Sequence, residues 1–178
     1  PWDNIFGFNN FNLKDFMDYL RANNMYFICK LHHMEMNELN EKDYIGYEDV
    51  FRFLKEEELV MKEIDLYEIL ANIELLITDY SSVYFDMLLI DIPLLFVPTD
   101  IDYYIRNRGF NFEPYDFWTP GFKAYNQGEL SESISSSLRD DHFKNDRKKI
   151  CDIVHKYQDN KSNSRVWKMI DRLLENKK

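Results

Sequence analysis

The sequence predicts an α/β fold in which a parallel sheet is flanked by helices, and two features of the pattern lead to this prediction. Short apolar segments rich in aromatic and branched residues alternate with amphipathic helical segments. Apolar segments of this kind are typical of parallel strands that are buried on both faces. Strand–helix–strand units of such lengths imply right-handed crossovers within one sheet. A chain of 178 residues can bury a core and is expected to form one domain.

The first elements are predicted in the N-terminal third of the chain. Asn12 can cap a helix, and residues 25–31 (MYFICKL) are expected to form a buried strand. The apolar stripe of that helix consists of Leu13, Phe16, Met17 and Leu20. Residues 44–62 are ambiguous, because YIGYEDVF could hold a strand while FRFLKEEELVMKEI also fits a helix.

The central elements follow the strand–helix–strand order most clearly. Asp65 is expected to cap a short helix over residues 66–70. Strands are predicted at 74–78 (ELLIT) and at 94–97 (LLFV), and a helix at 82–90 connects them. This order is the one that a parallel sheet with helical crossovers requires.

The last part of the chain is predicted to be a loop followed by helices. Residues 99–127 are expected to form one long aromatic loop, which contains Pro114, Pro120 and Gly121. A loop of that length inside a compact domain usually carries function. The three closing helices are predicted at 128–138, 143–157 and 164–174.

Composition excludes several classes of protein. With 45% hydrophobic and 16% aromatic residues, the chain is neither disordered nor fibrous. Its apolar runs fall short of the ~18 residues that a membrane span needs, and Pro1-Trp2-Asp3 does not resemble a signal peptide. Cys29 and Cys151 lack the spacing of a metal site or a disulfide framework, so a reducing cytosol is the expected compartment.

The charge is distributed unevenly between the expected core, residues 1–138, and the C-terminal helices, residues 139–178. The helices hold twelve Lys or Arg against seven Asp or Glu, a net +5, so the core carries −15 and the whole chain −10. An acidic body argues against a nucleic-acid partner. The basic end could contact an anionic membrane surface or a polyphosphate chain, and a solvated helix face is the simpler alternative.

The most informative segment is LLITDYSSVYFD, residues 75–86, in which a buried strand leads through a polar turn into a helix. Ligands of open parallel sheets bind beyond the carboxyl ends of the strands, where free N–H groups of the next helix favour an anion. Ser81 and Ser82 add hydroxyls that can donate to phosphate oxygens. The alternative is that Ser81 only caps its helix. Asp79 counts against a phosphate unless its carboxylate orients another group.

A second candidate group, Lys30-Leu31-His32-His33, ends the first strand and is expected at the same sheet edge. Histidine exchanges a proton near neutral pH, and its protonated form can neutralise a phosphate. A metal site would need a further ligand, and neither a cysteine nor a third histidine has suitable spacing. An exposed histidine pair at a strand end is the other alternative.

The third candidate group contains Asp100, Tyr104 and Arg108-Gly109-Phe110, with a Pro-Gly pair further along. An aromatic loop with an arginine can cover a nucleotide and clamp its phosphates. By itself this signal is weak, because an arginine in a loop is usually solvated.

Taken in order, these segments resemble the family of CDP-glycerol glycerophosphotransferases, which includes teichoic-acid polymerases and primases and related capsule polymerases. The resemblance rests on LLITDYSSVYFD, IPLLFVPTDIDYY and RNRGFNFEPYDFWTPG in that order. KLHH is similar to the family's basic–apolar–His turn, and DNKSNSRV to its C-terminal Asp-x-x-Ser…Arg segment. The resemblance extends from about Met25 to Arg165.

The resemblance implies a GT-B architecture, in which two Rossmann-like domains enclose the active site between them. This chain would be the C-terminal, CDP-alditol-binding domain, and the N-terminal acceptor domain would be absent. Trp2 is similar to the start of that domain in the family. Two departures stand out: His33 replaces a common proline, and Asp3 replaces an arginine. Both bear on substrate choice and on activity.

The resemblance also implies roles for particular residues. His32 would be catalytic, contacting the pyrophosphate and assisting the leaving phosphate. Asp86 would fix the loop or contact the alditol, and Arg108 would clamp the phosphates. The implied donor phosphate and nucleotide site comprises Thr78, Asp79, Ser81, Ser82, Asp86, Arg108, Gly109, Pro120 and Gly121.

The implied reaction transfers glycerol phosphate, or a related polyol phosphate, from CDP-glycerol or CDP-ribitol to a lipid-linked or polymer acceptor. It would take place in the cytoplasm, at the inner face of a bacterial cell membrane. No cofactor is firmly implied; a divalent metal is compatible with the reaction, although no protein site for one is evident. Two alternatives stay open: half of a GT-B enzyme that uses a nucleotide sugar, and a non-catalytic nucleotide-binding domain.

Overall fold

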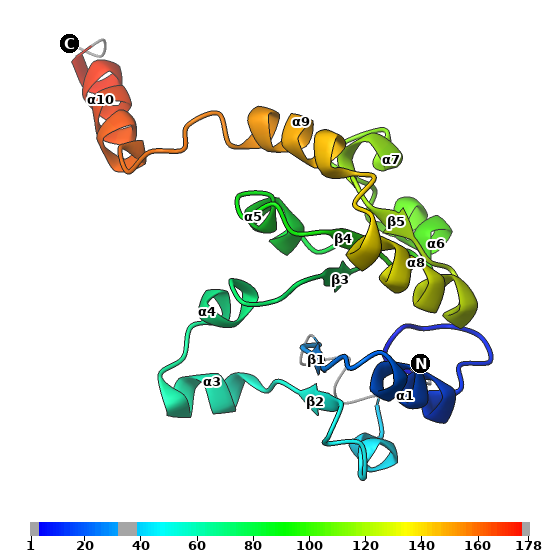
Figure 1. The fold of residues 1–178 in the computed structure, drawn as a ribbon. Helices are drawn as coiled ribbons and strands as arrows, with labels where there is room; N and C mark the ends of the chain where they lie inside the picture. The colour runs from blue at the N-terminus through cyan, green and yellow to red at the C-terminus, as the bar shows by residue number, and fades with distance from the viewer. Residues whose placement is uncertain (1–3, 32–38, 176–178) are drawn as a thin grey trace.

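The structure is a computed structural model that describes residues 4–31 and 39–175 (Figure 1). The strands are β1 (Phe27–Cys29), β2 (Phe51–Phe53), β3 (Leu76–Thr78), β4 (Leu94–Phe96) and β5 (Phe122–Lys123). The helices before β4 are α1 (Leu13–Ala22), the 3-10 helix η1 (Glu41–Tyr44), α3 (Glu56–Lys62), α4 (Leu66–Leu70) and α5 (Val83–Met87). The later helices are α6 (Ile101–Asn107), α7 (Tyr115–Trp118), α8 (Gln127–Arg139), α9 (Lys144–Val154) and α10 (Ser162–Glu175).

The predicted α/β fold with helices around parallel strands is confirmed, but the described strands form two parallel sheets and not the single sheet that was expected. β1 pairs with β2, and the second sheet has the order β3-β4-β5. In the second sheet Leu76 lies opposite Leu94, and Leu95 lies opposite Phe122. Because all three strands of this sheet run the same way, the turns that follow β3 and β4 leave it at one edge.

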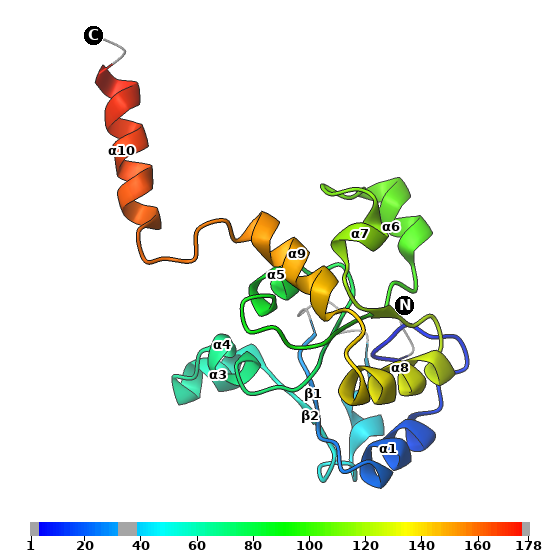
Figure 2. The same cartoon turned by 45° about the horizontal axis from the view of Figure 1, so that its top comes forward.

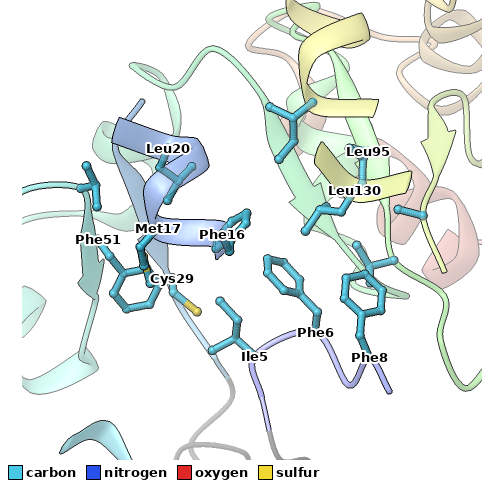
Figure 3. Packing of buried hydrophobic residues seen from close by; sticks show 14 of the residues in the cluster. Ile5, Phe6, Phe8, Phe16, Met17, Leu20, Cys29, Phe51, Leu95 and Leu130 are labelled. Carbon is cyan, nitrogen blue, oxygen red and sulfur yellow. The ribbon is translucent and has the colours of Figure 1, made fainter. Parts of the chain in front are cut away.

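The larger hydrophobic core joins the N-terminal segment and α1 to both sheets and to α8 (Figure 3). Phe16, Met17 and Leu20 are buried on the inner face of α1, as its apolar periodicity predicted. The Asn12 side chain accepts a hydrogen bond from the Asp15 N–H at 3.2 Å, which confirms the predicted cap. Phe16 also meets the ring of Phe6 at 5.4 Å, so its truncation to alanine would cost about 3–5 kcal/mol.

A second core cluster lies between β3, β4, α5 and α9. The guanidinium of Arg147 is buried beside it, with 1% of its side chain exposed. It donates to Asp91 Oδ1 at 2.9 Å and to Asp141 Oδ1 at 2.6 Å. The bond from Arg147 lowers the pKa of the Asp141 carboxyl. This bonded triad attaches α9 to the turn before β4, and a buried charge left without its partners would be strongly destabilising.

Of the two interpretations of residues 44–62, the helix is correct from Glu56 onward. The strand lies in FRF, at the start of the part that also fitted a helix, and takes only Phe51 from YIGYEDVF. β2 lies at Phe51–Phe53 and α3 begins three residues later, with three glutamates in its first turn. Those carboxylates are stabilised near a helix N-terminus, and this favours the change from strand to helix at that point.

The prediction of one long loop at 99–127 is wrong. The structure places α6, α7 and β5 there. Gly109, with a φ of 70°, lies just after the end of α6. There the N–H groups of Arg108 and Gly109 both donate to the Tyr104 carbonyl, which closes the last turn of the helix. The strand β5 has two residues and joins the sheet edge, where the Ala124 N–H donates to the Phe96 carbonyl at 2.9 Å. Elements this short leave no periodic pattern in a sequence.

The three C-terminal helices are present, and they differ in how they pack. α8 lies against β4 and β5, and α9 buries Ile150 and Cys151. α10 has no buried residue and stands away from the rest of the described chain (Figures 1 and 2). Within residues 4–31 and 39–175, no helix is both long and apolar enough to cross a membrane.

Candidate functional site

The turn between β3 and α5, which we call the serine turn (residues 79–82), is shaped by local hydrogen bonds. Asp79 Oδ1 accepts from the Ser81 N–H at 3.1 Å, and Ser81 Oγ accepts weakly from the Val83 N–H at 3.5 Å. Ser82 occupies the N-cap position of α5 but makes no side-chain capping bond. Both serines are exposed. The Asp79 carboxylate therefore orients the turn, which gives it a role there, although it keeps its negative charge.

The helix that follows the serine turn is too short to supply much of a dipole. α5 has five residues, and the macrodipole effect depends on several aligned peptide units. An anion at this turn would depend on direct donors instead. Ser81 Oγ accepts one bond, so its own hydrogen stays free to donate, and the Ser82 hydroxyl is open to solvent.

Four rings connect the serine turn to the end of α6 and to α7. Tyr80 stacks on Tyr104 with centroids 4.1 Å apart, Tyr104 on Phe110 at 5.1 Å, and Phe110 on Tyr115 at 4.9 Å. We call Tyr80, Tyr104, Phe110 and Tyr115 the aromatic column. The Tyr80 hydroxyl also donates to Asp100 Oδ1 at 2.9 Å. Burial, and secondarily this bond to a carboxylate, raises the pKa of Tyr80, so its phenol stays protonated.

Arg108 is the C-cap residue of α6 and falls between Tyr104 and Phe110 in the sequence. Its side chain is exposed and makes no ion pair within the described part of the chain. An exposed guanidinium without a carboxylate partner can bind an anion without first breaking an ion pair. Gly109 has a backbone role: its positive φ lets the chain turn so that Phe110 returns onto Tyr104.

Asp86 connects two helices. It lies on α5, and its Oδ2 accepts from the Tyr67 hydroxyl of α4 at 2.8 Å. That bond raises the pKa of Tyr67. Of the two roles considered for Asp86 from the sequence, fixing the neighbouring structure is the one for which the geometry shows a contact.

Pro120 and Gly121 are not brought together with the serines. Both are buried and directly precede β5, whose Phe122 pairs with Leu95. They therefore lie at the amino ends of the strands, whereas Ser81 follows a carboxyl end. A Cβ atom on Gly121 would lie 2.1 Å from the Leu94 carbonyl oxygen. This glycine is needed for close approach of two backbones, and sequence alone does not separate that need from close approach to a ligand.

His32 and His33 lie outside the described residues, as do Trp2 and Asp3. Lys30, two residues before His32, follows β1, and its Nζ lies 3.0 Å from Glu56 Oε2. Within residues 4–31 and 39–175, no group of three or more His, Cys, Asp or Glu side chains could hold a metal ion.

Sequence reasoning missed the contacts of Tyr80, Asp100 and Tyr115. Tyr80 stands inside the serine turn, but nothing local shows that its ring faces α6 rather than solvent. The Tyr115 hydroxyl is buried and has no hydrogen-bond partner in the described part of the chain. Its pKa is raised by burial, with a smaller contribution from Asp79 among other groups. The only sequence signal was the density of aromatic residues between 103 and 118.

Comparisons with known proteins bear on the family and the fold of this chain. The sequence profile of the family described as CDP-Glycerol:Poly(glycerophosphate) glycerophosphotransferase matches residues 3–172. The teichoic acid poly(ribitol-phosphate) polymerase of Bacillus spizizenii is 30% identical over 148 residues, which are 83% of this chain and 22% of that protein. The teichoic acid ribitol-phosphate primase of the same organism is 31% identical over 151 residues, covering 76% of this chain and 36% of the primase.

Solved structures show the same fold. The wall teichoic acid polymerase TagF superposes with a TM-score of 0.64 at 20% identity, covering 93% of this chain and 38% of TagF. A variant of TagF soaked with CDPG gives a TM-score of 0.61 at 23% identity, covering 93% of this chain and 39% of the variant. The chain thus spans less than two fifths of the length of each of these relatives.

Proposed function

This chain belongs to the CDP-glycerol:poly(glycerophosphate) glycerophosphotransferase family, and from that premise we propose that it is the donor-binding domain of a polyol-phosphate transferase. The enzyme would transfer glycerol phosphate or ribitol phosphate from a CDP-activated donor to a hydroxyl acceptor. One observation carries the assignment to this domain. The exposed serine turn and the unpaired Arg108 are joined by the aromatic column.

The proposed reaction is a displacement at phosphorus. An acceptor oxygen attacks the β-phosphorus of the donor and loses its proton, while the bond from that phosphorus to the bridging oxygen breaks and CMP leaves. Such a reaction needs groups held in place and negative charge neutralised. Ser81 and Ser82 supply hydroxyl donors, and Arg108 supplies a permanent positive charge. His32 is proposed to contact the pyrophosphate and to assist the departure of CMP.

We assign Thr78 and Asp79 to the shape of the turn, Gly109 to the position of Arg108, and Asp86 to the attachment of α5. Pro120 and Gly121 lie at the other strand ends, so we assign them to packing. The acceptor site and the base that receives the acceptor's proton are proposed to lie in an N-terminal domain outside this sequence. The acceptor itself is proposed to be lipid-linked or a growing polymer, since the named relatives are primases and polymerases.

The two alternatives from the sequence have less support. The family description names CDP-glycerol, and a related polymerase was soaked with CDPG, whereas no nucleotide sugar occurs in these names. A non-catalytic domain would bind a nucleotide without turnover, and only activity of a complete enzyme separates it from our proposal.

Calorimetry tests donor binding directly. We expect CDP and CDP-glycerol or CDP-ribitol to bind residues 1–178 with micromolar to millimolar dissociation constants, because the proposed donor contacts lie in this chain. UDP-glucose is the control and should bind more weakly. A binding heat for UDP-glucose, together with no binding heat for CDP-glycerol and CDP-ribitol at millimolar concentration, would overturn the substrate assignment.

We also propose that the protein acts at the cytoplasmic face of an anionic membrane, with α10 as the contact. α10 exposes a row of apolar side chains, and basic residues accompany it along the helix. The apolar residues are Val166, Trp167, Met169, Leu173 and Leu174, and the basic ones are Arg165, Lys168 and Arg172. An amphipathic helix of this composition suits the interface of an anionic bilayer.

Vesicle co-sedimentation tests this contact. We expect residues 1–178 to bind phosphatidylglycerol vesicles more than phosphatidylcholine vesicles, and Trp167→Glu with Leu173→Glu to abolish binding because charged side chains do not enter the acyl boundary. Val60→Glu, at a 69% exposed site on α3, is the matched control. Unchanged binding by the double variant, or no preference for the anionic lipid, would contradict the proposal.

A further inference from the structure

Tyr80 links two turns that leave the same edge of the sheet. It lies between Asp79 and Ser81 in the turn after β3, and its hydroxyl donates to Asp100 Oδ1, in the turn after β4, at 2.9 Å. Asp100 occupies the N-cap position of α6, yet its side chain makes no capping bond to that helix. An aspartate at an N-cap usually serves its own helix. Here the carboxylate accepts from the serine turn instead.

The ring of Tyr80 adds a second attachment, to the part of α6 that carries Arg108. Tyr104, on which Tyr80 stacks at 4.1 Å, lies one helical turn before Arg108, and its carbonyl accepts from the Arg108 N–H at 2.8 Å. Phe110, on the other side of Arg108, returns to stack on Tyr104 at 5.1 Å. The rings that hold Tyr80 thus also determine where the backbone of Arg108 lies.

We propose that Tyr80 is a positioning residue for the donor phosphates: it holds the turn that carries Ser81 and Ser82 against the end of α6, from which the side chain of Arg108 extends. The inference rests on the proposed function, since it concerns the same site. Ring packing alone would require only a phenylalanine at this position. The hydroxyl adds a directional hydrogen bond to a charged acceptor. Such a bond is stronger than one between neutral groups, and it sets the orientation of the serine turn relative to Asp100.

The experiment compares CDP with cytidine in binding to the full chain, and uses Tyr80→Phe to remove the hydroxyl while keeping the stack. We expect Tyr80→Phe to weaken CDP binding by roughly tenfold, as loss of one bond to a charged group predicts, with cytidine affinity within about twofold of the wild type. The lost bond should also lower the melting temperature by a few degrees, so the ratio of CDP to cytidine affinity is the decisive readout. Tyr103→Phe removes a hydroxyl from an exposed ring on α6, beside Tyr104, and should behave as the wild type.

Asp100→Ala and the double variant complete a thermodynamic cycle. If the bond transmits the effect, Asp100→Ala in the Tyr80→Phe background should weaken CDP binding no further. Wild-type affinity for CDP in Tyr80→Phe would overturn the inference, and so would an equal loss for CDP and cytidine, which would indicate packing alone. If the wild-type chain bound no CDP, the proposed function itself would fail, and this inference with it.

Discussion

At the scale of single residues, the hydrogen bond that Asp79 accepts determines which donors Ser81 and Ser82 can offer to a ligand. A carboxylate beside a phosphate site looks unfavourable in the sequence. In the structure it accepts the Ser81 N–H, so the carboxylate shapes the turn while keeping its charge. Ser81 and Ser82 are left with hydroxyl hydrogens that can point outward. The turn is therefore suited to donate to an anion, although its backbone N–H at Ser81 is already used.

Replacing both serines tests this assignment. Ser81→Ala with Ser82→Ala should weaken CDP binding by about 1–3 kcal/mol, because two donors to phosphate are lost. Cytidine, which has no phosphate, should bind nearly as before, and calorimetry of both ligands measures the difference. Ser164→Ala, at an exposed position on α10, is the control. Equal losses for the two ligands would mean that the serines only support the turn.

At the scale of elements, two glycines that look alike in the sequence have different tasks. Gly109 adopts a φ of 70°, and a Cβ atom there would come no closer than 3.9 Å to its nearest neighbour, the Ile105 carbonyl oxygen, so only conformational strain opposes a larger residue. Gly121 lies in contact with the backbone of β4, and a Cβ atom would meet the Leu94 carbonyl oxygen at 2.1 Å. The first glycine ends a helix, and the second allows β5 to join the sheet.

The two alanine substitutions should therefore differ in cost. We expect Gly109→Ala to lower the free energy of unfolding by about 1 kcal/mol, from strain at positive φ. Gly121→Ala should cost about 3 kcal/mol or more, because backbone atoms of β4 or β5 must move. Urea denaturation of both variants measures this. A stable Gly121→Ala protein with weakened CDP binding would show instead that Gly121 contacts the donor.

At the scale of the whole molecule, the proposed reaction needs more than a donor site. We propose the serine turn, Arg108 and the aromatic column as the donor side. The transfer would also need an acceptor hydroxyl and a base in reach of its proton, which we propose lie in another part of the enzyme. Among the other histidines, His142 is exposed, and His155 makes a 2.7 Å contact with the Phe85 carbonyl in support of α5. His155 is thus engaged in packing, and we assign no catalytic role to His142.

We therefore predict that residues 1–178 alone release no CMP from CDP-glycerol in the presence of an acceptor. Supplying the N-terminal domain in one polypeptide should restore release, and His32→Ala in that enzyme should lower turnover by roughly 100-fold or more while CDP still binds. His142→Ala is the matched control and should stay active. Steady turnover by the chain alone, or full activity of the His32→Ala enzyme, would defeat this mechanism.

The sequence by itself determined the elements whose signals are local. The cap at Asn12, the apolar stripe of α1, the strand before the serine turn and the closing helices each follow from residues within one or two turns of each other. The order of the motifs was also sufficient to indicate the family, and residues 3–172 match it.

Only the tertiary structure decided which side chains meet. Tyr80 and Asp100 are 20 residues apart, and Gly121 contacts Leu94 across 27 residues, so neither contact leaves a local pattern. The short elements α6, α7 and β5 exist because rings and strand edges from distant segments pack against them, whereas their own sequences resembled a loop. Caps and periodicity act through the chain's nearest neighbours, but stacking and close backbone approach depend on how the whole sheet brings its turns together.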